Sequence, residues 1–123
     1  MQTSEYYRLL SEFWVRSGLP LRQAGLGPGS HQPPCLAYSA VCPAFGGEAL
    51  MEADAWFGGA TAAQQRDKFL QTLETMLPER GIHIAGDGGM IIIRRSEKDF
   101  VKTEEAGAPV LHVRIRAAVR LYG

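Results

Sequence analysis

The spacing of apolar residues near the start of the chain predicts a helix. Between Glu5 and Ser17 the apolar positions recur every three or four residues, so they fall on one face of a helix. These positions are Tyr6, Leu9, Leu10, Phe13 and Trp14. Gly18 and Pro20 come next, and both residue types end helices. We therefore expect an amphipathic helix within residues 1–17.

A second helical pattern follows Thr61. Thr61 and Gln64 have the spacing of a capping box, in which the two side chains bind the first free backbone donors of a helix. The apolar stripe that follows consists of Phe69, Leu70, Leu73, Met76 and Leu77. Pro78 and Gly81 predict the end of this helix near Leu77.

Strict alternation of apolar and other residues predicts strands elsewhere. The clearest case is Val110 to Tyr122, where every second residue is apolar and arginines lie between them. Residues 48–57 alternate in the same way, and residues 35–42 form a short, mostly apolar strand. Residues 82–95 read as a hairpin, because glycine and aspartate at 86–89 suit a tight turn.

These elements predict a two-layer α+β sandwich. We expect a mainly antiparallel sheet of about five strands, with one or two helices packed on one face. The chain of 123 residues forms a single domain, 1–123, in which residues 35–123 are the core. Residues 18–34, with four glycines and four prolines, are expected to form an irregular loop, and residues 96–108 a flexible one.

Composition excludes several classes of protein. The chain has 13 basic and 13 acidic residues, and this zero net charge disfavours a specific nucleic-acid partner or an anionic membrane surface. It shows no signal peptide and no apolar run long enough to span a membrane. Two cysteines, Cys35 and Cys42, are too few for a disulfide framework, and we interpret them as thiols of a cytoplasmic protein.

Residues with catalytic or metal-binding potential do not form a recognised motif. His31, His83 and His112 lack metal-ligand spacing, so exposed or interfacial histidines are the favoured interpretation. Glu52 and Asp54 share one face of a strand; this pair suits cation binding or carboxylate chemistry, but a solvated or partner-facing acidic face is favoured. The glycine-rich stretch 25–30 lacks the ending of a phosphate loop. We predict no enzyme activity, no cofactor and no metal site.

Two charged stripes of opposite sign are the most distinctive feature of the sequence. The strand 48–57 carries Glu48, Glu52 and Asp54 without a basic residue, and the strand 110–122 carries arginines and a histidine without an acidic one. The stripes could pair across the sheet within one subunit. Alternatively, they could meet across a subunit contact, where an acidic patch against the next copy's basic patch closes a ring.

The order of these segments resembles a known family, the small tail-terminator or tail-completion proteins of long-tailed bacteriophages and prophages, also described as minor capsid or minor tail proteins. The resemblance covers residues 34–123. It rests on an early strand PCLAYSA at 34–40, an alternating strand ending in ADAWF at 53–57, a helix with FLQTL at 69–73, the segment GMIIIRR at 89–95 and the closing strand HVRIRAAV at 112–119.

The resemblance implies a non-enzymatic structural protein of virion assembly. Six copies would form a ring that ends the tail tube and connects the tail to the head. Its partners would be further copies of itself, the tail tube protein and a head-completion or neck protein. It would act in the host cytoplasm during assembly and then lie at the head–tail junction. No cofactor is implied.

On this interpretation the charged stripes set the register between subunits, and the loop 96–108 becomes ordered on meeting a neighbour. The expected contact residues are Glu48, Glu52, Asp54, Trp56, His112, Arg114, Arg116 and Arg120 from the stripes, and Phe100 and Val101 from the loop.

Two other functions fit the same sequence. A head-side connector or stopper protein of the phage neck would share small size and ring formation, and would differ only in its partner. A bacterial α+β domain that binds a small ligand would need a pocket, and we would expect it near Cys35, Tyr38 and His83.

Overall fold

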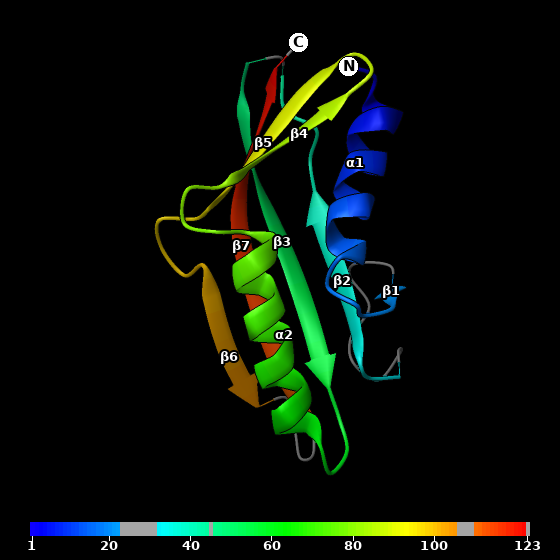
Figure 1. Cartoon of the computed structure of the whole chain (residues 1–123), viewed down its shortest axis with the longest axis vertical. Coiled ribbons are helices and arrows are strands. Elements are labelled where there is room, and N and C mark those ends of the chain that lie inside the picture. The colour runs from blue at the N-terminus through cyan, green and yellow to red at the C-terminus, as the bar shows by residue number, and fades with distance from the viewer. Residues whose placement is uncertain (23–31, 45, 106–109, 123) are drawn as a thin grey trace.

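The computed structural model describes residues 1–22, 32–44, 46–105 and 110–122. They form two helices and seven strands (Figure 1). The elements are α1 (Thr3–Val15), β1 (Leu21–Arg22), β2 (Cys35–Ala40), β3 (Glu48–Phe57), α2 (Ala62–Met76), β4 (Ile82–Gly86), β5 (Gly89–Arg95), β6 (Val101–Glu105) and β7 (Leu111–Tyr122).

The strands form one sheet in the order β1-β2-β3-β7-β5-β4, and β6 also pairs with β7. β1 and β2 are parallel, whereas the other pairs are antiparallel. The α+β class is confirmed, but the sheet is mixed and has seven strands rather than about five antiparallel ones. One added strand is β1, which lies inside the stretch 18–34 that was expected to be irregular. Residues 23–31 of that stretch, including His31 and the glycine-rich segment 25–30, lie outside the described residues.

The long strand β7 supports two shorter strands along one edge. β5 pairs with its second half, from Ala117 to Tyr122, and β6 pairs with its first half, from Leu111 to Ile115. Between them, Ser96 donates to the Arg116 carbonyl and the Arg116 N–H donates to the Phe100 carbonyl. The expectation of a flexible loop over 96–108 is therefore wrong for residues 101–105, because the free edge of β7 pairs with their backbone. Residues 106–109 lie outside the described part.

Both helices cover the same face of the sheet (Figure 1). The apolar residues of β3 and β7 alternate toward this face, as predicted, and they meet the stripes of α1 and α2 in one core. The largest side chains that are fully buried there include Trp14, Tyr6, Phe13 and Phe57. The aromatic residues of α1 therefore supply much of the volume that closes the core.

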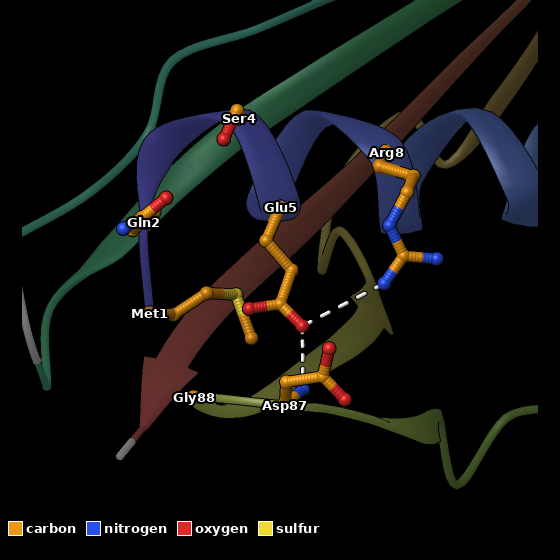
Figure 2. Close-up of a pocket in the computed structure, with 7 residues that line it drawn as sticks. All are labelled: Met1, Gln2, Ser4, Glu5, Arg8, Asp87 and Gly88. Carbon is orange, nitrogen blue, oxygen red and sulfur yellow. Dashed lines mark hydrogen bonds and ion pairs between the residues drawn. The ribbon is translucent and has the colours of Figure 1, made fainter.

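α1 also holds the tip of the β4–β5 hairpin. Figure 2 shows the Glu5 carboxylate between the Arg8 guanidinium, 3.6 Å away, and the backbone of Asp87, whose N–H donates to it. A Cβ atom on Gly86 would lie 2.5 Å from Glu5 Oε1 and 3.0 Å from a Leu9 methyl group. The side chains of Glu5 and Leu9 would have to move to make room for any larger residue at this position.

The start of α2 differs from the prediction of a capping box. Thr61 is the N-cap residue, but its side chain makes no cap hydrogen bond. Instead, the Gln65 amide donates to Thr61 Oγ1 at 2.8 Å. The predicted helix itself is confirmed, with Phe69, Leu73 and Met76 buried against the sheet.

Candidate functional site: the open face of the sheet

The face of the sheet opposite the helices carries the two charged stripes. We call its central part the open face; it comprises Glu48, Leu50, Glu52 and Asp54 of β3 and Arg114, Arg116, Ala118 and Arg120 of β7. These residues alternate with the buried core positions of the same two strands. Within the described residues, no helix or strand lies across the open face.

The register of β3 and β7 brings each acid opposite an arginine. Glu48 lies opposite Arg120, Glu52 opposite Arg116 and Asp54 opposite Arg114. Of the two arrangements that the sequence left open, pairing within one subunit is therefore present in the structure.

We call these three acid–arginine pairs between β3 and β7 the ladder. Their ion pairs differ in geometry. Arg114 Nε lies 3.0 Å from Asp54 Oδ1, and Arg120 Nε lies 3.0 Å from Glu48 Oε2. Glu52 has looser contacts, 3.7 Å to the Nε of Arg116 and 3.9 Å to that of Arg114. The ladder thus has two hydrogen-bonded ends and a looser middle.

The surroundings of the two tight acids shift their pKa values. The hydrogen bond from Arg120 lowers the pKa of Glu48 below its ordinary value. Burial alone would raise the pKa of Asp54, but hydrogen bonds from His112 and Arg114 outweigh burial and hold this pKa below its usual range. Both carboxylates are therefore charged at neutral pH, and their negative charge is stabilised by the folded state.

Beyond Asp54 the same face is closed by a small second cluster. Trp56 is 7% exposed and packs with Cys35, Ala37 and Val110. His112 stacks on Trp56 with ring centroids 5.5 Å apart, and its Nε2 donates to Asp54 at 2.6 Å. Burial raises the pKa of the Cys35 thiol. Two of the expected contact residues, Trp56 and His112, are thus engaged inside the subunit.

The expected contact residues from the segment 96–108 also make contacts within the subunit. Phe100 and Val101 are partly buried against the main core. The Arg95 guanidinium lies 4.7 Å from the centre of the Phe100 ring, and Arg95 Nε donates to the Leu77 carbonyl at 2.8 Å. These contacts attach the segment 96–100 to the end of α2, so the exposed part of the site is narrower than the sequence suggested.

Leu50 is the apolar feature of the open face that the sequence did not single out. It is 51% exposed and lies opposite Ala118. A hollow of about 500 Å³ lies beside it, lined by Glu48, Arg94 and Ala118 among others, and a second of about 270 Å³ lies toward β2. Its large exposed fraction, between two charged stripes, marks Leu50 as a candidate contact point of the open face.

Another hollow lies away from the open face. This hollow, of about 680 Å³, lies at the start of α1 and is lined by residues such as Met1, Arg8 and Asp87 (Figure 2). The three residues proposed for a ligand pocket are not brought together. Cys35 faces away from the helices, Tyr38 packs on the helix side with its hydroxyl 2.6 Å from Ser11 Oγ, and His83 is exposed on β4 at the far end of the sheet order.

Comparisons with known proteins add no identification: no family model, curated protein or solved structure matches this chain. In the part of the chain that the structure describes, no three His, Cys, Asp or Glu residues are grouped so that they could hold a metal ion. Neither α1 nor α2 is long and apolar enough to cross a membrane.

Proposed function

We propose that this chain is a structural protein of phage assembly, a tail terminator whose copies form a ring on the end of the tail tube. It acts without catalysis, and its partners are further copies, the tube protein and a protein of the neck. The segments that carry the resemblance become β2, β3, α2, β5 and β7, so they lie together in the central sheet and the helix across it.

The open face is the observation that supports this proposal best. A protein that acts on a small molecule needs a concave site with converging polar groups. A protein that acts by contact needs a broad surface with an apolar centre and a polar rim. The open face has the second character, because Leu50 lies among partly exposed Glu–Arg pairs.

Because the acids and arginines are already paired within the chain, opposed charges need not hold ring neighbours together. We therefore assign the open face to an axial contact, with the tube or neck protein, and the lateral ring contacts to other surfaces. A head-side stopper of the neck would use the same surface and differ in its partner.

Ring formation can be tested by native mass spectrometry and negative-stain electron microscopy over a series of protein concentrations. We expect closed rings of six copies. A chain that stays monomeric throughout, and also fails to bind the tube protein of the same virus, contradicts the proposal.

A further inference from the structure

We propose that the open face binds the open face of a second copy across a two-fold axis that runs parallel to β3 and β7 and midway between them, with each Leu50 packed over the partner's Ala118. This contact rests on the proposed function only in that it uses the same surface. When no tail is present, the second copy covers the open face.

The cross-strand register makes the open face complementary to itself. A two-fold axis in this position lays β3 of one copy over β7 of the other at the same height. Each residue of β3 then faces, on the partner, the same residue type that it faces in its own sheet. Glu52 meets an Arg116 of the other copy, and Leu50 meets an Ala118. Packed sheets are twisted relative to each other by about 30°, so the match is best at Leu50 and Glu52.

The shape of the surface agrees with this arrangement. Leu50 projects beside the hollow of about 500 Å³ that Ala118 helps to line. In the two-fold arrangement the Leu50 side chain of each copy enters that hollow in the other. The contact therefore buries an exposed leucine, and the charged residues around it become the rim.

The charged residues retain bonding capacity for a second partner. A guanidinium has five N–H donors, and a carboxylate accepts about four hydrogen bonds. Among the described residues, Arg114 contacts Asp54 and Glu52 through Nε, so its two terminal nitrogens are available for another carboxylate. The side chains of Glu52 and Arg116 are 38% and 34% exposed. These second pairs fix the register of the dimer more than they strengthen it.

The size of the surface predicts a reversible contact. With the neighbouring strands included, β2 beside β3 and β5 or β6 beside β7, seven residues along β3 and the width of four strands give about 23 Å by 19 Å, or roughly 900 Å² counted on both copies. Contacts of this size are weak. We therefore expect dimers that dissociate on dilution and at high salt, and rings that stack in pairs through the same contact.

The first test is a single substitution at the apolar centre. Leu50→Asp should abolish pairing through the open face in analytical ultracentrifugation, so that dimers of the natural chain become monomers and paired rings become single rings. Val15→Asp is the matched control, because Val15 is 61% exposed on the helix side of the molecule. It should leave the dimer intact. A Leu50→Asp variant that still dimerises overturns the proposal.

The second test separates contacts between copies from those within one chain. In the proposed dimer, residue 52 of one copy faces residue 116 of the other. Glu52→Arg alone therefore places two positive charges opposite one another, and Arg116→Glu alone places two negative charges opposite one another. Each variant alone should dimerise poorly. Mixed one to one, they restore both opposite-charge pairs between copies, while the pairs within each chain stay mismatched.

Native mass spectrometry of the mixture should therefore show the heterodimer far in excess of either homodimer. An absence of heterodimers overturns the two-fold register, even if rings and tube binding are observed. Conversely, heterodimers from a chain that never forms rings or binds tubes would uphold this contact and refute the proposed function.

Discussion

The two faces of the sheet are formed by the same strands but differ in the interactions that their side chains make. On the helix side, Ile115 and its neighbours in β3 and β7 are fully buried under α1 and α2. On the open face, Arg114 and Arg116 of the same strand form ion pairs with partly exposed acids. Burial of apolar surface supplies most of the folding free energy, whereas exposed ion pairs contribute about 0–1 kcal/mol each. The fold thus depends on one face, which leaves the other available for contact.

The largest difference between the faces should appear when the same charge is placed on each. Ile115→Asp puts a carboxylate into the fully buried core and should cost more than about 4 kcal/mol, enough to unfold a domain of this size. Ala118→Asp, three residues along β7 on the open face, should cost less than about 1 kcal/mol. Circular dichroism with urea titration measures both; equal losses would contradict the comparison.

The close approach of α1 to the hairpin makes a second prediction for the helix side. Gly86→Ala should destabilise the fold by up to about 1 kcal/mol, because the side chains of Glu5 and Leu9 must move away from the new methyl group. Gly88→Ala is the nearby control, since its methyl group would lie 3.2 Å from the terminal residue Met1, which can shift. Thermal denaturation should show the larger decrease in melting temperature for Gly86→Ala, and an unchanged melting temperature would contradict a tight fit of Glu5 and Leu9 against the hairpin.

Within the open face, the tight and loose pairs should differ. Asp54→Asn weakens two short hydrogen bonds, from His112 and Arg114, and should cost about 1–2 kcal/mol. Glu52→Gln removes only contacts of 3.7 Å and longer and should cost less than about 0.5 kcal/mol. The free energy of unfolding in urea distinguishes them. A larger loss for Glu52→Gln would contradict the distances.

Acid should weaken the open face selectively. The pKa values of Glu48 and Asp54 are lower in the folded chain than their ordinary values of 4.5 and 3.8. Their contribution is therefore complete above these ordinary values and is lost as the pH falls through the lower, folded pKa values. The double variant Glu48→Gln/Asp54→Asn should have a flatter decline in stability below about pH 5 than the natural chain. Parallel declines would show that other carboxylates dominate.

Periodicity was enough to predict the two main helices, the alternating strands and which residues of β3 and β7 face the core. It also identified the acids and arginines of the ladder, because alternation fixes which side chains share a face. It could not decide between pairing within and between subunits. That choice depends on strand order, which is a long-range property: β3 and β7 are neighbours in the sheet although α2 and three strands separate them in sequence.

The parts that could not be predicted depend on tertiary contacts. β6 has a charged sequence, Val101 to Glu105, and is a strand because the edge of β7 is there to pair with it. Leu50 lies in an alternating strand on the polar side, so the pattern marked its face but gave no reason to expect a contact point. The docking of α1 on Gly86 joins residues far apart in sequence, and the glycine-rich turn predicted only a hairpin.

The most direct test of the central claim is the length of tail tubes grown with and without this protein. Tube protein of the same virus is polymerised alone, with the natural chain and with Leu50→Asp, and the tubes are measured by negative-stain electron microscopy. The account predicts short tubes that end in a ring with the natural chain, and long uncapped tubes with Leu50→Asp, which remains folded. Tubes of unrestricted length with the natural chain, or equal capping by both, would contradict it.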